Sequence, residues 1–230
     1  MRKLLILSQD QKAFPDRKKA GEILARQLNN FKKENPVVLG IPRGGLVVAK
    51  EVADYLGAEL DIVLSRKLGA PGNPELAIGA ISENGRLFLN EVVSSQVGAK
   101  NAYVQQEKKH QLDEIASRVK RFRSLRPKVS LKQRTVIITD DGVATGATMQ
   151  AAIWAVHQER AAKIIVALPV GPQETLDKLS KDADQIICLK APVFFGAVGQ
   201  FYDYFDQTED EEVVNILKQN LRRPSQEKKE

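Results

Sequence analysis

Two acidic residues, Asp140 and Asp141, end an apolar run in the stretch TVIITDDGVATGATMQ, residues 135–150. Adjacent like charges repel, so the arrangement raises the question of what balances them. Small side chains follow, and a predicted helix begins near residues 145–148. The first N–H groups of a helix lack intrahelical partners and, with the helix dipole, bind anions. The stretch therefore joins carboxylates that can accept from a vicinal diol to a loop that can bind a phosphate.

A second loop, Gly40-Ile41-Pro42-Arg43-Gly44-Gly45, has similar chemistry after another apolar run. A divalent cation would ease the repulsion of the acidic pair, and phosphate, diol and metal together describe a ribose phosphate. Each feature alone has a simpler interpretation, because Gly/Thr turns after buried strands are common and Asp residues often cap helices. The string is neither a Walker A loop nor a G-x-G-x-x-G fingerprint.

The elements around these loops alternate between strands and helices. Helices are predicted over 17–31, with Asp16 as N-cap, over 46–56 and along the amphipathic stretch 112–122; a capping box, T-x-x-E at 208–211, opens the last one. Strands are predicted at 37–40, 60–65, 76–81, 136–139, 164–168 and 185–189, with a hairpin arm at 85–90. Residues 66–74 contain many turn formers and are expected to be a mobile loop. Such alternation predicts an α/β fold with a mostly parallel sheet, whose ligands bind beyond the carboxyl ends of the strands.

Composition limits the class of protein. The 230 residues, 43% of them hydrophobic, suffice for one well-buried core. No apolar run approaches the roughly 18 residues of a membrane helix, and the N-terminal apolar stretch lacks the cleavage site of a signal peptide. The single cysteine, Cys188, favours a reducing cytoplasm. The formal charge of +6 indicates anionic partners, either a phosphorylated small molecule or nucleic acid.

The string VIITDDGVATGAT resembles the hallmark of the type I phosphoribosyltransferases, although Gly142 is unusual directly after the acidic pair. The turn GIPRGG is similar to that family's pyrophosphate loop, and SRKLGAPGNPELAIGAIS to its strand, flexible loop and strand. Residues 14–215 as a whole look like a bacterial subgroup of predicted phosphoribosyltransferases that also has an aromatic FYDYF segment.

This resemblance implies a parallel-sheet type I phosphoribosyltransferase-like fold with helices on both faces and a small hood. We expect one domain at 14–222, an N-terminal extension at 1–13 and a frayed tail at 223–230. The implied reaction transfers phosphoribosyl from phosphoribosyl pyrophosphate to a nitrogen base, with Mg²⁺, and releases pyrophosphate.

The resemblance also implies the roles of the site residues. Asp140 and Asp141 would hold the ribose hydroxyls and place the metal. The 5′-phosphate would be bound by Ala144, Thr145, Gly146, Ala147 and Thr148. The pyrophosphate would meet Arg43, Gly44 and Gly45, and Arg66 or Lys67 would close over it from the mobile loop.

Other residue types are better explained by packing or solvation. His110 and His157 fall on predicted helices without metal-ligand spacing. Cys188 lies in an apolar strand and Trp154 in the helix after the phosphate loop, so both are expected in the core.

The basic segment 118–134 carries eight Lys and Arg residues without an acidic one. We favour a solvated helix face and loop over a nucleic-acid surface. The second interpretation supplies an alternative function, a non-catalytic regulator that senses the sugar pyrophosphate and binds nucleic acid. A transferase whose acceptor is not a free nucleobase would share the same donor-site residues.

The acceptor is the part of the reaction that the sequence leaves open. Phe194, Phe195, Phe201, Tyr202 and Tyr204 could stack on a base or pack within a hood. Family members that act on 6-oxopurines typically carry an aspartate where this chain has Ala144, whereas members that act on adenine have an alanine there. We therefore expect a preference for a 6-amino base, unless another residue such as Asp203 supplies the carboxylate. A homodimer is common among relatives.

Overall fold

The computed structural model describes residues 3–124 and 127–221, and its strands form two sheets. The larger is a parallel six-stranded sheet in the order β1-β9-β8-β7-β2-β3, and the smaller is antiparallel in the order β4-β5-β6. The strands of the parallel sheet are β1 (Leu4–Ser8), β2 (Val37–Gly40), β3 (Glu59–Ile62), β7 (Thr135–Thr139), β8 (Lys163–Val170) and β9 (Gln185–Lys190). Those of the antiparallel sheet are β4 (Ser65–Ala70), β5 (Asn73–Ser82) and β6 (Leu87–Leu89).

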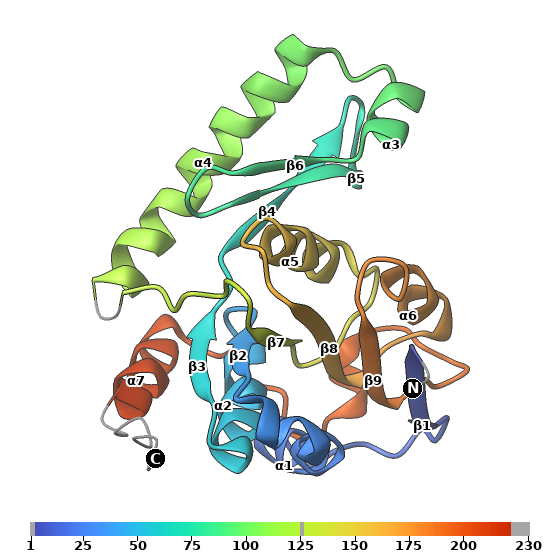
Figure 1. Ribbon diagram of the computed structural model, residues 1–230. Coiled ribbons are helices and arrows are strands. Elements are labelled where there is room, and N and C mark those ends of the chain that lie inside the picture. Colours follow the sequence, from blue (N-terminus) through green and yellow to red (C-terminus); the bar gives the residue numbers. More distant parts are fainter. Residues whose placement is uncertain (1–2, 125–126, 222–230) are drawn as a thin grey trace.

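Helices cover both faces of the parallel sheet (Figure 1). One face carries α1 (Arg17–Gln27), α2 (Gly45–Leu56) and α7 (Asp210–Leu221). The other carries α5 (Ala147–His157) and α6 (Gln173–Leu179). The α/β fold class with a parallel sheet is thereby confirmed. Among the described helices none is both long and apolar enough to cross a bilayer.

The near-continuous apolar strands follow from this double coverage, because a strand buried on both faces has no polar side. In β7, Val136 and Ile138 pack toward α5 and α6, whereas Ile137 packs toward α1 and α2. All three side chains are fully buried, and each contributes on the order of 1.5–3 kcal/mol through its removal from water. The central strand that ends in the acidic pair is therefore anchored on both sides.

Helix α1 begins as predicted, since the Asp16 side chain accepts a hydrogen bond from the Lys19 backbone N–H at 2.6 Å. It ends at Gln27, four residues before the predicted end, and a 3₁₀ helix, η1 (Asn29–Glu34), carries the chain on. Phe31 is still buried, because a 3₁₀ turn keeps the apolar side chain on the side of the core.

The antiparallel sheet forms a second unit with α3 (Glu91–Gln96) and α4 (Asn101–Arg123). We call residues 65–123 the antiparallel lobe. In Figure 1 it stands above α5, so that this helix lies between the two sheets. Ala80, Phe88 and Trp154 pack in this layer, and the rings of Phe88 and Trp154 stack with centroids 4.6 Å apart. The hairpin arm predicted at 85–90 is confirmed as β6, which pairs antiparallel with β5.

The prediction of a loop at 66–74 is wrong, because most of these residues form strands; the mobility of the segment stays a prediction. Residues 65–70 form β4, which pairs antiparallel with β5 and leaves only a short tip at Pro71-Gly72. The Tyr103 hydroxyl of α4 donates to the Gly69 carbonyl at 2.9 Å. The turn-forming residues suggested a loop, but they fit into the hairpin because the register of the β4–β5 pairing shifts next to this tip.

The first strand lies in the segment that we expected to be an N-terminal extension of the domain. β1, within the expected N-terminal extension, pairs in parallel with β9 at the edge of the sheet. The expected tail at 223–230 lies outside the described residues. The domain at 14–222 stays a prediction.

Candidate active site

The two loops singled out in the sequence leave the sheet side by side. Gly40 at the end of β2 is paired with Thr139 at the end of β7, and the Ile41 N–H donates to the Thr139 carbonyl at 3.0 Å. Because the strands are parallel, both loops emerge at the carboxyl edge. The turn 41–44 and the acidic pair therefore lie against each other.

Contact between these loops explains two glycines. A Cβ built on Gly44 would lie 2.1 Å from Asp141 Oδ2, and one on Gly45 would lie 2.7 Å from Asp140 Oδ1. Any side chain at either position would displace a carboxylate. The Pro42–Arg43 peptide bond in this turn is cis.

Asp141 is held by residues from both ends of the chain. Arg17 Nε, on the first turn of α1, donates to Asp141 Oδ2 at 2.7 Å, and these side chains are only 12% and 15% exposed. The guanidinium also donates to the Asp206 carbonyl at 2.7 Å and lies 3.8 Å from the Phe205 ring centroid. The Tyr202 hydroxyl donates to the Asp141 carbonyl. Arg17 thus supplies the neighbouring cation that the adjacent acids require.

Sequence reasoning missed Arg17, and no local pattern could have found it. It lies 124 residues from Asp141 in the chain and follows an ordinary N-cap.

Burial raises the pKa of Asp140 well above its usual value, and the negative charge of Asp141 raises it further. Burial also raises the pKa of Asp141, while the hydrogen bond and charge of Arg17 act in the opposite direction. Asp140 Oδ1 accepts the Asp141 backbone N–H at 2.9 Å, which favours the charged form. The pair is thus poised to gain from any further cation or hydrogen-bond donor.

The segment 144–148 leads into α5, which begins at Ala147. Ala144, Thr145 and Thr148 are exposed, so the start of the helix is open to solvent. The buried Thr175 of α6 donates its hydroxyl to the Ala144 carbonyl at 2.7 Å and holds the loop. The geometry is that of a helix N-terminus able to bind an anion.

Gly142, unusual after an acidic pair, has a packing cause. A Cβ there would lie 2.7 Å from a Val198 methyl and 2.9 Å from a Val170 methyl. The chain after Asp141 packs against the last residue of β8 and against the segment after β9, and no room is left for a side chain at position 142.

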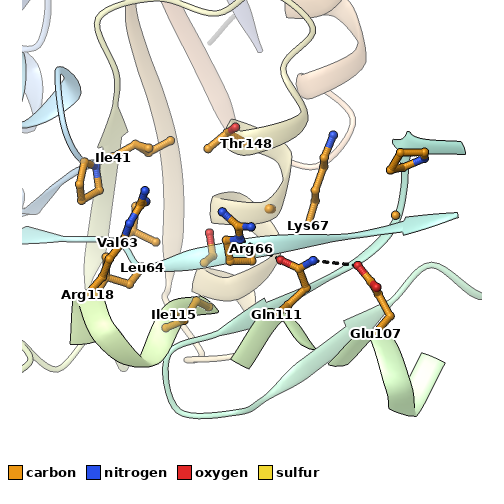
Figure 2. Close-up of a pocket in the computed structure, with 15 residues that line it drawn as sticks. Ile41, Val63, Leu64, Arg66, Lys67, Glu107, Gln111, Ile115, Arg118 and Thr148 are labelled. Carbon is orange, nitrogen blue, oxygen red and sulfur yellow. Dashed lines mark hydrogen bonds between the residues drawn. The ribbon is translucent and has the colours of Figure 1, made fainter. Parts of the chain in front are cut away.

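A pocket of about 450 Å³ lies between the parallel sheet and the antiparallel lobe. Its walls are the turn after β2, the β3–β4 connection, α4 and the first turns of α5. Figure 2 shows Arg66 and Lys67 on β4 above Gln111 and Glu107 of α4. Arg66 Nε donates to Gln111 Oε1 at 2.8 Å. The pocket brings Arg66 and Lys67 together with Thr148, whereas Asp140 and Asp141 lie outside its lining.

Comparison with known proteins agrees with this arrangement. The profile of the family described as phosphoribosyl transferase domain matches residues 11–206. The chain belongs to the phosphoribosyl transferase family. A Mycobacterium tuberculosis H37Rv protein, provisionally named a phosphoribosyl transferase, is 44% identical over 206 residues. The match covers 90% of this chain and 46% of that protein, so the chain spans about half the length of the curated relatives that it matches.

A crystal structure of a Thermus thermophilus protein is similar over most of the fold. It is 46% identical, with a TM-score of 0.86, over 90% of this chain and 98% of that chain. The type I phosphoribosyltransferase resemblance is confirmed.

In this member of the phosphoribosyl transferase family, the Arg43 side chain lies near the start of α7. Arg43 Nη1 lies 3.8 Å from Glu209 Oε2, and both side chains are exposed to solvent. The side chain is thus long and free enough to reorient, since an exposed pair at this distance contributes little.

The basic segment 118–134 is mostly engaged within the fold. Arg123 bonds Asp61 and Glu83, each at 2.7 Å, and Lys128 pairs with Glu83 and Glu159. Arg121 pairs with Asp210, and Arg134 with Glu59. Arg126 lies outside the described residues. Both interpretations of the segment, a solvated face and a nucleic-acid surface, miss this structural role.

The aromatic residues proposed as pocket walls divide into two groups. Phe201 and Tyr202 are buried in the core with Phe14, whereas Phe194 and Tyr204 are 78% and 73% exposed. Phe195 packs on Phe201 with ring centroids 5.2 Å apart. For Phe201 the packing interpretation is therefore correct.

The remaining candidates follow the simpler interpretation. Cys188 is buried, and burial raises the pKa of its thiol to about 12. Trp154 is buried, and its indole N–H has no partner within the described residues. His157 bonds the Asp182 carbonyl at 2.7 Å and His110 is exposed. Within residues 3–124 and 127–221 no three His, Cys, Asp or Glu side chains gather as a metal site.

Proposed function

We propose that this chain transfers the phosphoribosyl group of phosphoribosyl pyrophosphate to a nitrogen base and releases pyrophosphate. One observation carries the proposal: the acidic pair touches the glycines of the turn after β2 and lies directly before the open N-terminus of α5. A donor with a diol between two anionic groups matches that order of sites.

Each part of the donor has residues suited to it. Asp140 and Asp141 accept hydrogen bonds from the two ribose hydroxyls. The N–H groups and hydroxyls of the loop 144–148 bind the 5′-phosphate. The backbone of Gly44 and Gly45 and the side chain of Arg43 meet the pyrophosphate, and Arg66 and Lys67 add charge from β4.

The residues present fit a magnesium ion. Magnesium takes one or two carboxylates and otherwise keeps water and substrate phosphate oxygens. The adjacent carboxylates of Asp140 and Asp141, whose pKa values burial raises, would hold it. When bound, the metal supplies positive charge to the pyrophosphate.

Catalysis by these residues is mainly positioning and charge stabilisation. As the bond from C1′ to the pyrophosphate oxygen breaks, the ribose gains oxocarbenium character, as in glycoside hydrolysis. The fixed carboxylates hold the ribose while the base nitrogen forms the new bond to C1′, and the proton of that nitrogen passes to the departing pyrophosphate or to water. The cations of Arg43, Arg66 and Lys67 stabilise the charge that develops on the leaving group.

The acceptor is proposed to be a 6-amino purine. Ala144 can neither take nor give a proton, and its carbonyl is already bonded to Thr175. A 6-oxopurine would therefore lack a carboxylate from this position.

The test is a panel of adenine, hypoxanthine, guanine, xanthine and uracil incubated with labelled donor and magnesium. Pyrophosphate release with adenine, faster than with the other bases, is the expected result. Faster turnover of hypoxanthine or guanine would show that Ala144 does not set the preference. Release with none of these bases would contradict transfer to a free nucleobase.

A further inference from the structure

One side of α4 lines the pocket and carries a cation, Arg118, that lies outside the sequence motifs of the donor site. Glu107, Gln111, Ile115 and Arg118 recur at helical spacing, and all four line the pocket of about 450 Å³. Ile115 and the following Phe122 are 3% and 1% exposed, so they fix the rotation of the helix. Arg118 is therefore held on the pocket side by its apolar neighbours.

Among the side chains that the structure describes, no carboxylate lies within ion-pair distance of Arg118. The next two arginines of α4, Arg121 and Arg123, both have carboxylate partners. Its i−4 neighbour Glu114 lies 3.6 Å from Arg66 instead.

Three cations line the same pocket. Figure 2 shows the charged ends of Arg66, Lys67 and Arg118 turned to one side, toward Ile41 and Thr148. The lining otherwise contains one carboxylate, Glu107, whose oxygen is occupied by the Gln111 amide at 2.8 Å. Apolar walls such as Val63 and Leu64 lower the local dielectric and strengthen attraction for an anion.

We infer that Arg118 binds the pyrophosphate group of the donor, together with Arg66. This rests on the proposed function, since the pocket adjoins the turn at Ile41 and Pro42 that is proposed to meet that group. A guanidinium can form paired hydrogen bonds to phosphate oxygens and remains charged throughout. The inference adds a binding residue from outside the sequence motifs of the donor site.

The experiment measures the binding of two probes by calorimetry in the presence of magnesium. The probes are inorganic pyrophosphate and ribose 5-phosphate, which represent the two ends of the donor. Arg118→Gln is expected to weaken pyrophosphate binding about tenfold, the loss of one charge-assisted contact, and to leave ribose 5-phosphate binding unchanged. Arg118→Lys should retain part of the affinity.

The matched control is Lys120→Gln, which removes an exposed cation from the same helix outside the pocket lining. Equal losses in Arg118→Gln and Lys120→Gln would show a general charge effect and overturn the inference. Unchanged pyrophosphate affinity in Arg118→Gln would overturn it as well. Binding and turnover of the donor by the unmodified protein test the proposed function separately, so either can fail without the other.

Discussion

At the scale of single residues, the acidic pair is tolerated because its charge is balanced by a residue that lies far from it in the sequence. Arg17 is seated between the Phe205 ring, the Asp206 carbonyl and Asp141. These three contacts fix the Arg17 guanidinium, and the guanidinium in turn holds the Asp141 carboxylate in one orientation in the absence of a ligand. Preorganisation of this kind reduces the entropy that binding costs.

Arg17→Gln should lower the free energy of unfolding by about 3 kcal/mol, because it leaves a mostly buried carboxylate without its counter-charge. Urea unfolding at pH 7 measures the change. Lys19→Gln is the control, since it removes only an exposed pair with Glu22 and should leave stability unchanged. Equal stabilities of Arg17→Gln and the unmodified protein would mean that the pair is not stabilising.

Asp140→Asn should increase stability at neutral pH and reduce its dependence on pH. Burial and the charge of Asp141 raise the pKa of Asp140 well above 3.8. Between these two values the folded protein holds a proton that the unfolded chain has lost, so stability falls as pH rises through that window. An asparagine removes this loss and can still accept the Asp141 N–H.

Unfolding in urea at several pH values from 5 to 8 tests the change at Asp140. Asp10→Asn should leave the slope over this range unaltered, because the pKa of Asp10 is lowered and the group is ionised in both states. A steeper slope in Asp140→Asn than in the unmodified protein would contradict the prediction.

At the scale of elements, the antiparallel lobe is tied to the parallel sheet by a cluster of ion pairs. Arg123 at the end of α4 bonds Asp61 of β3 and Glu83 after β5, and its guanidinium also donates to the Ile62 carbonyl. The Val129 N–H donates to Asp61 Oδ2 at 2.9 Å. Residues at both connections between the lobe and the sheet, Ile62 at the first and Arg123 and Val129 at the second, therefore meet at one cluster. The cluster thus links the two parts of the molecule that line the pocket.

Glu83→Gln should cost about 3 kcal/mol, because it leaves Arg123 and Lys128 with one buried carboxylate partner fewer. Burial opposes ionisation of Glu83, but its partners hold its pKa below the usual value, so the carboxylate is charged at pH 7. Chemical denaturation measures the loss. Glu174→Gln, in an exposed pair on α6, should leave stability unchanged. A loss of equal size in both variants would contradict the special role of the cluster.

At the scale of the whole molecule, the site is assembled from both ends of the chain. Phe14 forms an isolated parallel bridge with Tyr202, and Tyr202 in turn bonds Asp141. A ligand at the carboxyl edge would therefore contact loops that join α1, the central sheet and the segment before α7. Binding there should stabilise the fold as a unit.

Phosphoribosyl pyrophosphate with magnesium, at about one hundred times its dissociation constant, should stabilise the protein by about 2.7 kcal/mol. The double variant Asp140→Asn with Asp141→Asn should fold but show no such gain, because it lacks the carboxylates for the ribose hydroxyls and the metal. Thermal unfolding with and without ligand measures both. Equal stabilisation of the double variant and the unmodified protein would contradict the assignment of the acidic pair.

The sequence by itself determined the parts that depend on neighbouring residues. The apolar run before Asp140, the small residues at 142–147 and the turn at 40–45 are local patterns, and they predicted β7, the start of α5 and the turn after β2. The alternation of predicted strands and helices likewise predicted the α/β class, because a helix between two strands lets them pair in parallel.

Only the tertiary structure decided which distant residues complete the site. Arg17 meets Asp141 across 124 positions, Arg118 reaches the pocket through the packing of Ile115 and Phe122, and residues 66–70 become a strand because β5 offers a partner. Such contacts leave no local signal, since each depends on how separate elements pack. Burial also decided between the two interpretations of Phe201, because a ring in the core and a ring in a pocket wall have the same sequence pattern.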